Sequence, residues 1–426
     1  MKSLEPANTV VTIIGQGYVG LPLAQAIVDS GFRVHGLEVS QRRVDALNAG
    51  LSHVDDISDS ELQSMLSSGY SATTDPAVLR SSDFVLICVP TPLDSNGGPD
   101  LGAVEEATRT IATNFKHGSC VVLESTTYPG TTQEIVLPLL ENSGAVQGKD
   151  FFLAFSPERV DPGSKHYDIR NTPKLVGGVT PSSTRVAAEF YAHFIDTVVP
   201  LSGAKEAETA KLLENTYRHV NIALVNEMAK FCYDMDIDIW EVIRGASTKP
   251  FGFQRFTPGP GVGGHCIPID PNYLGFQVKK TLGYQFKFVE LAQEINNSMP
   301  AYVVERVADL LNDSGKALNG SSVLLLGITY KANIADQRET PALPIAEILH
   351  KKKARVSFHD PLVEDWQIGD STLRRVSDLR TAVESADVVV LLQDHKFYTE
   401  SNLADKAQVF FDTRGSGHGI PGVVTL

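Results

Sequence analysis

The sequence predicts an α/β protein with two doubly wound parallel-sheet domains joined by a long central helix. Short β-branched runs alternate with helical patterns in both halves of the chain, the order that parallel strands with helical crossovers require. Between the halves, apolar residues recur at spacings of three and four from Ala204 to about Met235, which indicates one long helix. We therefore expect a Rossmann-like domain over 1–200, a central helical domain over 201–315 and a second Rossmann-like domain over 316–426.

Length and charge limit the classes of function. A chain of 426 residues is too long for one hydrophobic core, so two or three domains are expected. Its 37 basic and 51 acidic side chains give a net charge of −14, which opposes binding to nucleic acid or to an anionic membrane. A small anionic ligand would need Lys, Arg and backbone N–H groups placed locally around it.

The cysteines and the hydropathy pattern suggest the compartment. The four cysteines have neither paired nor metal-ligand spacing, which is usual in the reducing cytosol, and we expect no metal site. No signal peptide precedes the first predicted strand, and no apolar run reaches the ~18 residues that a membrane span requires. A soluble, cytoplasmic protein is expected.

The first predicted strand, Val10–Ile14, leads into a GxGxxG motif over 15–20 and then into an apolar helix. In this context the first glycine permits a tight turn, the second lets the backbone approach a pyrophosphate, and the third packs helix on strand. The second predicted strand, Arg33–Leu37, ends at Glu38, where an acid accepts ribose hydroxyls and repels a 2′-phosphate. The motif predicts NAD binding, although an isolated acid at a strand end is also common on protein surfaces.

Polar segments follow three further predicted strands in the first half. The strands over 83–89, 120–124 and 151–155 end in the sequences PTP, STT and SPER. In a doubly wound sheet, ligands lie beyond the carboxyl ends of the strands, so these segments are expected to line a site. Ordinary turn chemistry is the alternative for each segment taken alone.

The long helix and the second half supply basic side chains. Lys211 and Asn215 lie four residues apart and so share a helical face.

The second half lacks GxGxxG, so a mononucleotide and a partner subunit are both compatible with it. The segments 274–282 and 351–355 are interpreted as solvated or linking surface. The predicted strands of the second half are 321–327, 354–360, 387–392 and 408–412.

A glycine-rich loop over 257–270 reads TPGPGVGGHCIPID and delivers Cys266. Its four glycines before the cysteine let the backbone approach a ligand closely. An accessible cysteine beside backbone donors is a candidate nucleophile. A small apolar cysteine in a tight turn is the plainer alternative.

Taken together, these motifs resemble those of the UDP-glucose/GDP-mannose dehydrogenase family. The matching segments run in order from about residue 10 to the C-terminus: GQGYVGLPLA, VPTP, STTYPGTT, SPERVDPG, AKLLENTYRHVNIALVNE, GVGGHCIPIDP and LGITYKANIADQRETP. Within the family, GGHC with IPIDP and PERVDPG resemble the branch that acts on UDP-N-acetylhexosamines, above all UDP-N-acetylglucosamine. The mannosamine and galactosamine epimers and UDP-glucose are the alternative substrates.

The resemblance implies a four-electron oxidation of the sugar C6 alcohol to a carboxylate, with two NAD used in turn, which supplies a uronic acid for a surface polysaccharide. By resemblance, Cys266 captures the aldehyde as a thiohemiacetal, which is oxidised to a thioester and then hydrolysed. Lys211 and Asp270 hold and polarise a water near the alcohol and stabilise the alkoxide. The residues matched to catalytic positions are Cys266, Lys211, Asp270, Asn215, Glu158 and Thr126.

The remaining catalytic positions also carry over from the family. Thr126 and Asn215 match residues that hydrogen-bond the water and the oxyanion. Glu158 matches the acid that acts as base in thioester hydrolysis. The second acid of the UDP-glucose pattern is replaced here by Pro162, so Glu158 would act without it.

Ligand contacts are implied in the same way, with NAD in the first domain and the UDP-sugar between the cysteine loop and the last domain. The implied cofactor contacts are Gly15, Gly17, Tyr18, Val19, Gly20, Glu38, Arg43, Pro90, Thr91 and Thr126. The implied substrate contacts are Glu158, Arg159, Val160, Lys211, Asn215, Arg255, Phe256, Gly263, Lys331 and Arg338. Arg255 matches an arginine offered to the neighbouring subunit, and the long helix matches the core of a homodimer or higher homo-oligomer.

Two other functions share some of these sequence features. A non-catalytic sensor of NAD and nucleotide sugar would tolerate the loss of Cys266, Lys211 or Asp270, yet all three are present. A two-electron β-hydroxyacid dehydrogenase shares the first domain and the long helix, but it needs neither the cysteine loop nor a second α/β domain. The sequence therefore favours the four-electron enzyme.

Overall fold

The protein is described by a computed structural model that covers residues 4–94, 98–160, 166–264, 267–399 and 401–426. The chain forms two compact units, Met1–Glu214 with Asn272–Tyr284 and Asn215–Pro271 with Gln285–Leu426. Each unit contains a mainly parallel sheet flanked by helices. The 31-residue helix α7 (Ala204–Asp234) contributes residues to both units. The predicted fold class is confirmed.

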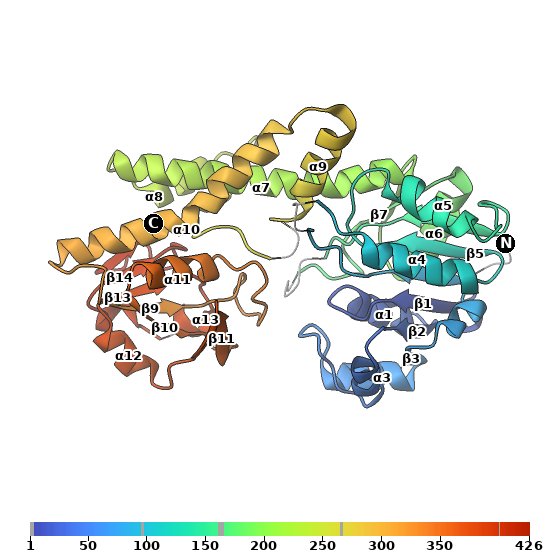
Figure 1. Ribbon diagram of the computed structural model, residues 1–426, viewed down its shortest axis with the longest axis horizontal. Coiled ribbons are helices and arrows are strands. Elements are labelled where there is room, and N and C mark those ends of the chain that lie inside the picture. The colour runs from blue at the N-terminus through green and yellow to red at the C-terminus, as the bar shows by residue number, and fades with distance from the viewer. Residues whose placement is uncertain (1–3, 95–97, 161–165, 265–266, 400) are drawn as a thin grey trace. The chain divides into compact units, whose positions relative to one another are not determined.

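The first unit contains an eight-stranded sheet in the order β3-β2-β1-β4-β5-β6-β7-β8 (Figure 1). The strand order reverses between β1 and β4, which is the point where doubly wound sheets bind ligands. The strands are β1 (Val10–Ile14), β2 (Arg33–Leu37), β3 (Tyr70–Thr73), β4 (Phe84–Ile87), β5 (Ser119–Leu123), β6 (Phe151–Phe155), β7 (Lys174–Gly178) and β8 (Val198–Pro200).

One strand of this sheet departs from the expected parallel pattern. β7 pairs antiparallel with β6, through Ala154 opposite Gly178 and Phe155 opposite Gly177. A parallel neighbour usually needs a crossover helix. The described residues between β6 and β7 contain no helix, so the chain returns in the opposite direction.

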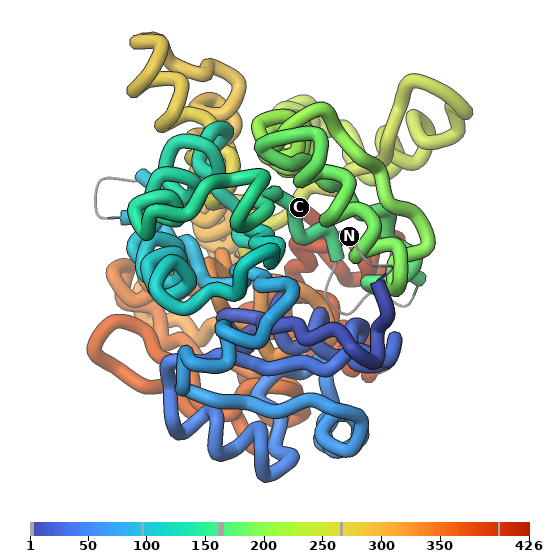
Figure 2. The backbone as a smooth tube through the Cα atoms, turned by 90° about the vertical axis from the view of Figure 1, so that its right-hand side faces the viewer, coloured from blue at the N-terminus to red at the C-terminus, as the bar shows by residue number. Residues whose placement is uncertain are grey.

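Helices cover both faces of the first sheet. In Figure 2 the blue segments that include β1, β2 and β3 lie next to the cyan segments that include α4 and β5. Besides the start of α7, the helices of this unit are α1 (Gly20–Asp29), α2 (Gln41–Asn48), α3 (Asp59–Ser67), α4 (Gly102–Asn114), α5 (Leu137–Glu141), α6 (Pro181–Tyr191) and, from Asn272 on, α9 (Asp270–Leu282), with 3₁₀ turns at Pro6–Asn8 and Pro76–Ser81 and a π-helical turn η3 at Thr132–Val136.

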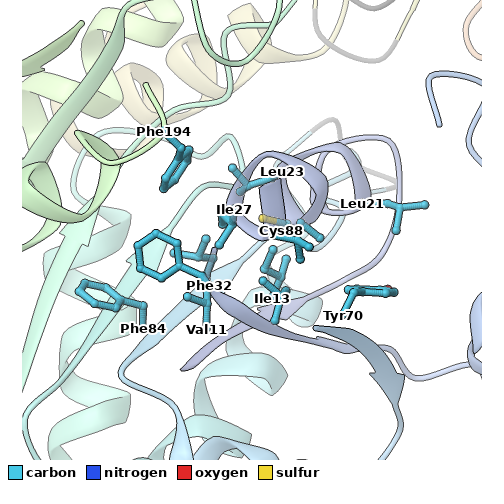
Figure 3. Packing of buried hydrophobic residues seen from close by; sticks show 14 of the residues in the cluster. Val11, Ile13, Leu21, Leu23, Ile27, Phe32, Tyr70, Phe84, Cys88 and Phe194 are labelled. Atoms are coloured by element: carbon cyan, nitrogen blue, oxygen red, sulfur yellow. The ribbon is translucent and has the colours of Figure 1, made fainter. Parts of the chain in front are cut away.

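The core of the first unit holds the glycine motif in place. Val11 and Ile13 of β1 pack against Leu23 and Ile27 of α1 (Figure 3), and all four are at most 1% exposed. A second cluster around Val85 fills the other face of the sheet. At roughly 1.5–3 kcal/mol for each large apolar side chain buried, these clusters fix β1 and α1, and with them the turn between the two.

The second unit contains a five-stranded parallel sheet in the order β10-β9-β13-β14-β15 and a separate two-stranded hairpin. Its strand order reverses between β9 and β13. The strands are β9 (Ser322–Leu326), β10 (Arg355–His359), β11 (Asp365–Ile368), β12 (Ser371–Arg374), β13 (Val388–Leu391), β14 (Phe410–Asp412) and β15 (Val423–Thr425). The helices, besides part of α7, are α8 (Ile239–Ala246), α10 (Lys287–Asp313), α11 (Ala342–Lys351), α12 (Leu379–Ser385), α13 (Lys396–Thr399) and the 3₁₀ turn Ala404–Lys406.

Two helices were not anticipated from the sequence. The segment 274–282, interpreted as linking surface, lies in α9, and Val278 on it is buried. Helix α10 runs for 27 residues across Pro300, a residue that ordinarily ends or kinks a helix. Burial of Val303, Val304 and other apolar side chains of α10 in the core of the second unit stabilises the helix despite the proline.

Neither a membrane-spanning helix nor a metal site is seen in the described ranges. There, no helix combines the length and apolarity needed to cross a bilayer. The same ranges contain no group of three or more His, Cys, Asp or Glu side chains arranged to hold a metal ion.

Candidate active site

The glycine motif lies at the reversal point of the first sheet, and its three glycines are required for different reasons. Gly15 has φ +93°, and a Cβ there would lie 2.6 Å from the carbonyl oxygen of Cys88. A Cβ on Gly20 would lie 1.9 Å from the carbonyl oxygen of Gly15. A Cβ on Gly17 would meet nothing within 4 Å. Two glycines therefore serve the turn itself, and the third leaves open space beside the backbone.

This open space lies at the start of α1. Tyr18 and Val19 complete the turn, and Val19 is the residue before the first helical one. Among the described residues no side chain caps this end, and the N–H of Leu21 donates a 3.1 Å hydrogen bond to the carbonyl oxygen of Gly17. The positive end of the helix dipole, with no side chain over it, favours a phosphate there. The residues fit the pyrophosphate of a dinucleotide.

Glu38 lies directly after β2 and is 6% exposed. Its carboxylate accepts hydrogen bonds of 3.2 Å from the backbone N–H groups of Gln16 and Ser40, and Arg43 Nη1 lies 3.7 Å from Oε1. A carboxylate has about four acceptor positions, so this geometry leaves capacity for a ribose diol. Burial and the charge of Arg43 lower the pKa of the nearby His53, a residue that the sequence interpretation did not single out.

The segments after β4 and β5 are bound to each other. The hydroxyl of Thr91 donates a 2.8 Å hydrogen bond to the carbonyl oxygen of Thr126, and the hydroxyl of Ser125 donates one of 2.7 Å to that of Val89. Thr91 is buried, whereas Thr126 is half-buried and Pro90 is exposed. In α9, the hydroxyl of Tyr273 donates to the carbonyl oxygen of Thr91. The side chain of Thr126 is thus presented on a fixed backbone.

The segment after β6 is held by α7. Lys211 is 7% exposed, and its Nζ donates a 2.5 Å hydrogen bond to the carbonyl oxygen of Glu158. The carboxylate of Glu158 accepts from the N–H of Val160. Arg159 forms a 2.8 Å ion pair with Glu214 of α7, so in this structure its guanidinium binds protein. The sequence motifs placed these residues near one another but did not identify Glu214 as a partner.

In the second unit, Asn215 of α7 contacts Asp270, the first residue of α9. Asn215 Nδ2 donates a 2.5 Å hydrogen bond to Asp270 Oδ2, and the two residues are 4% and 2% exposed. The structure thus brings together two of the residues matched to catalytic positions. Cys266 itself lies outside the described residues.

The described part of the cysteine loop packs against the segment after β9. A Cβ on Gly263 would lie 2.7 Å from both the carbonyl oxygen of Glu339 and the Cβ of Tyr330. The N–H of Gly264 donates a 3.0 Å hydrogen bond to the carbonyl oxygen of Arg338. Gly263 thus gives room to a neighbouring loop, and its predicted contact with a ligand stays a prediction.

Polar side chains buried in the second unit support the start of the cysteine loop. The N–H of Gly259 donates a 3.0 Å hydrogen bond to Asn226 of α7, whose amide donates one of 2.9 Å to Asn296 of α10. Phe256 contacts the ring of Tyr217, with ring centroids 5.9 Å apart. Arg255 is exposed.

The segment after β9 carries Lys331 and Arg338 at the reversal point of the second sheet. Arg338 is 46% exposed and pairs with Asp336 at 2.6 Å. The hydroxyl of Thr329 donates a 3.0 Å hydrogen bond to the carbonyl oxygen of Lys331. The half-buried Lys331 and the more exposed Arg338 thus bring two positive charges to one loop.

A buried histidine braces this loop and was missed in the sequence. His395 is fully buried after β13, and its Nδ1 accepts a 3.0 Å hydrogen bond from the N–H of Asn333. The proton therefore lies on Nε2, which is 3.1 Å from the buried carboxylate of Asp360. No motif pointed to this pair, because His395 and Asp360 follow different strands and meet only in the folded sheet.

A buried ion pair under the first site was also missed. Glu124, the residue after β5, is fully buried and lies 2.5 Å from Lys174 Nζ, and it accepts from the hydroxyl of Tyr191. Burial raises the pKa of Glu124, and the charge of Lys174 opposes that rise. Lone buried charges are costly, so this pair holds the ends of β5 and β7 together.

Sequence comparison matches three domains of one family in order along the chain. The NAD-binding domain of the UDP-glucose/GDP-mannose dehydrogenase family matches residues 9–195, its central domain 205–298 and its UDP-binding domain 324–417. The chain is 35% identical over 395 residues to the UDP-N-acetyl-D-mannosamine dehydrogenase of Pyrococcus horikoshii, a match that covers 92% of this chain and 91% of the relative.

Solved structures of nucleotide-sugar dehydrogenases also match this chain. The structure of the UDP-D-ManNAc dehydrogenase from Pyrococcus horikoshii matches with a TM-score of 0.89 at 32% identity, over 98% of both chains. The structure of the NDP-N-acetyl-D-galactosaminuronic acid dehydrogenase from Methanosarcina mazei matches with a TM-score of 0.81 at 30% identity, over 98% of this chain and 94% of the other.

Proposed function

The chain belongs to the UDP-glucose/GDP-mannose dehydrogenase family, and from this premise we propose that it oxidises C6 of UDP-N-acetylmannosamine to the uronic acid. As a family member it is an NAD-dependent nucleotide-sugar dehydrogenase of the UDP-N-acetylhexosamine kind.

The observation that carries the choice of epimer is the relative named for UDP-N-acetyl-D-mannosamine, which is 35% identical over 92% of this chain. The sequence motifs favoured UDP-N-acetylglucosamine instead. Both substrates carry the same UDP and acetamido groups and differ in the configuration at C2. Such a difference is discriminated by whether buried polar groups of the site find their partner on the sugar.

NAD, when bound in the first unit, accepts the hydride removed from C6. The chain's own residues hold it: the open backbone at Gly17 and the uncapped start of α1 suit the pyrophosphate. The Glu38 carboxylate suits the ribose diol of NAD and repels the 2′-phosphate of NADP.

We assign the proton chemistry at the alcohol to Lys211 and to the Asn215–Asp270 pair. Lys211 is a buried cation on α7, and a cation close to C6 stabilises the developing alkoxide. The Asp270 carboxylate takes the hydroxyl proton through a bound water. Asn215 orients this carboxylate with its 2.5 Å hydrogen bond.

The second half of the reaction is assigned to Cys266. Its thiolate adds to the C6 aldehyde to form a thiohemiacetal, and loss of a second hydride and a proton gives a thioester. Water then attacks the thioester carbonyl, the C–S bond breaks, and the carboxylate leaves with the thiol restored. Glu158 is assigned as the base for this water, and Thr126 as a hydrogen-bond donor to the oxyanion.

The UDP half of the substrate is assigned to Lys331 and Arg338. Two cationic side chains on one loop suit a diphosphate, because charge-assisted hydrogen bonds are the strong ones. An acidic protein of net charge −14 has to supply such groups locally.

We also propose that the exposed face of α7 pairs with a second copy of this chain. Leu224, Phe231 and Met235 are 50–59% exposed, and with Leu213, Tyr217 and Met228 they form an apolar stripe along the helix and the residue that follows it. An apolar stripe of one long helix is self-complementary in a two-fold dimer. Leu224→Glu is expected to lower the mass measured by light scattering, and an unchanged mass would reject this interface.

The experiment that tests the function measures NADH formed per sugar consumed, with NAD and a panel of UDP-sugars, at limiting sugar. Two NADH per UDP-N-acetylmannosamine are expected, with kcat/KM at least about tenfold above that of the glucosamine epimer. Two NADH from another sugar would correct the epimer. One NADH per sugar would reject the thioester mechanism.

A further inference from the structure

A buried carboxylate lies on α7, three residues before Lys211. Glu208 is fully buried, and its two oxygens accept three hydrogen bonds within the first unit. Oε2 accepts from the N–H of Gly130 at 2.6 Å, and Oε1 accepts from the N–H and the hydroxyl of Thr132 at 2.9 and 2.7 Å. Neither the family motifs nor the roles proposed above assign this residue a function.

These partners belong to the segment that carries Thr126. Gly130, with φ +105°, closes a turn in which the N–H and the hydroxyl of Thr131 donate to the carbonyl oxygen of Tyr128. Thr132 then begins the π-helical turn η3. Glu208 is therefore a buried contact through which α7 holds the chain immediately downstream of the β5 strand end.

Burial raises the pKa of Glu208 to about 7, and the three hydrogen bonds and the charge of Lys205 oppose that rise. Lys205 of α7 pairs with Glu134 at 2.8 Å. The other ionisable groups facing this region are Tyr128, Glu206 of α7 and, on α4, Glu105. Titration near neutral pH therefore falls on Glu208, because Lys205 stays charged and the pKa of Tyr128 is raised further above its usual value.

We propose that Glu208 is a positioning residue whose ionised carboxylate holds α7 against Gly130 and Thr132, and so sets the place of Lys211 relative to Thr126. The proposal rests on the role assigned to Lys211 above. All three donors point at carboxylate oxygens, so a proton on either oxygen removes the negative charge and turns three charge-assisted hydrogen bonds into weaker neutral ones. Protonation therefore loosens the helix without unfolding the unit.

The position of Lys211 changes when α7 loosens, because Lys211 lies one turn beyond Glu208 on the same helix. The hydrogen bond described for its Nζ goes to the carbonyl oxygen of Glu158. A shift of a catalytic group by about 1 Å can cost a hundredfold in rate. We expect the loosened form to lose more turnover number than ligand affinity. Although Lys211 and Thr126 match ligand contacts, neither the glycine motif nor the Lys331 loop, which carry the proposed pyrophosphate and UDP contacts, bonds to Glu208 in the described hydrogen bonds.

The test compares Glu208→Gln with two other variants of the holoenzyme. Gln keeps the length of the side chain but offers one acceptor oxygen in place of two. Thr132→Val removes one donor from the partner side and keeps the backbone bond. Glu206→Gln is the matched control, because Glu206 is an exposed acid on the same turn of α7.

The kinetic readout is the ratio of kcat between variant and wild type from pH 6 to 8.5, which cancels the titration of all other groups. At pH 8, Glu208→Gln is expected to lower kcat about tenfold with KM for the UDP-sugar and Kd for NAD within about twofold. Below pH 7 the kcat ratio should approach one, because Glu208 of the wild type is then protonated and α7 is loosened in both proteins. Thr132→Val should act in the same direction, less strongly and not additively with Glu208→Gln.

Amide hydrogen exchange over 128–136 provides a readout that needs no turnover. Exchange should be faster in Glu208→Gln than in wild type at pH 8 and equal at pH 6, with Glu206→Gln unchanged. Faster exchange with a kcat ratio that does not vary with pH would mean a merely structural role and overturn the proposal, as would unchanged exchange. If no UDP-sugar is turned over, the proposed function fails, and the exchange data still decide whether Glu208 grips the segment.

Discussion

Asn215 and Asp270 are joined by a 2.5 Å hydrogen bond between buried side chains, although 55 residues separate them in the sequence. A buried carboxylate costs free energy unless it is hydrogen-bonded. Asn215 provides that hydrogen bond and at the same time fixes the direction in which the carboxylate points. The pair is the part of the candidate active site that the described structure defines most completely.

Asp270→Asn tests this pair. The replacement keeps the shape, and an amide oxygen still accepts from Asn215, but it removes the base. We expect kcat to fall by about 10²–10⁴, with the Kd for NAD unchanged, measured by NADH formation and by a binding titration. Asp309→Asn, at an exposed position of α10, is the control. Retention of normal kcat by Asp270→Asn would remove Asp270 from the mechanism.

Cys266→Ala tests covalent capture of the aldehyde. The variant lacks the thiolate, so no thioester can form, and uronate production should be abolished while NAD binding stays within about twofold of wild type. Mass spectrometry of the product and a binding titration measure the two effects. Cys232→Ala, a buried core cysteine, should remain active. Steady uronate production by Cys266→Ala at the wild-type rate would refute the covalent route.

The glycine motif gives a matched pair of variants. Gly17→Ala adds a methyl group into open space, so the fold should be kept while the Kd for NAD rises by at least about tenfold, because the methyl group stands where the pyrophosphate approaches. Gly20→Ala places a methyl group 1.9 Å from the carbonyl oxygen of Gly15 and should cost about 1–3 kcal/mol of stability. Thermal unfolding and NAD titration separate the two. Equal loss of stability in both variants would contradict the open site.

Lys331→Ala tests the assigned UDP contact. Loss of a charge-assisted hydrogen bond costs about 1.5–3 kcal/mol, so binding of UDP should weaken by at least about tenfold while NAD binding is unchanged. Arg338→Ala should act similarly, but it also leaves the buried carboxylate of Asp336 without its 2.6 Å partner. Lys351→Ala, on the exposed end of α11, is the control. Equal losses of UDP and NAD affinity would indicate misfolding rather than a lost contact.

His219 predicts a pH dependence of the second unit's stability. Burial lowers the pKa of this histidine to about 4 from 6.5. The unfolded chain then binds more protons than the native one between these values, so stability is full above about pH 6.5 and is lost as the pH falls towards 4, by on the order of 3 kcal/mol. Urea unfolding from pH 7 to 4.5 should show a smaller loss in His219→Gln. An equal loss in the variant, or a smaller loss in the exposed control His117→Gln, would reject this assignment.

Much of the fold was predictable because its signals are local. The strands over 10–14, 33–37 and 151–155 were predicted with the bounds observed, since buried parallel strands are continuous β-branched and aromatic runs. The start of α7 at Ala204 was predicted from the spacing of three and four between its apolar residues. Helix α10 was missed because Pro300 interrupts the pattern. Strand β7 was not predicted, and its antiparallel direction could not have been, because nothing in a strand's own residues records which way its neighbour runs.

The candidate site was predictable only where residues follow strands of one sheet. Thr91, Thr126 and Glu158 share an edge because parallel strands end on the same side. The ion pair between Glu124 and Lys174, which are 50 residues apart, was not predictable.

By itself, the sequence determined the two α/β units, the glycine turn, the family and the residue types available for chemistry, since each depends on short-range pattern. The tertiary structure alone decided which polar groups are buried together: Asn215 with Asp270, His395 with Asp360, and Glu208 with Gly130 and Thr132. The physical reason is that a buried charge or amide is tolerated only with a partner, and the partner is selected by proximity in the folded chain. The distance between two residues along the sequence does not show whether they become such partners.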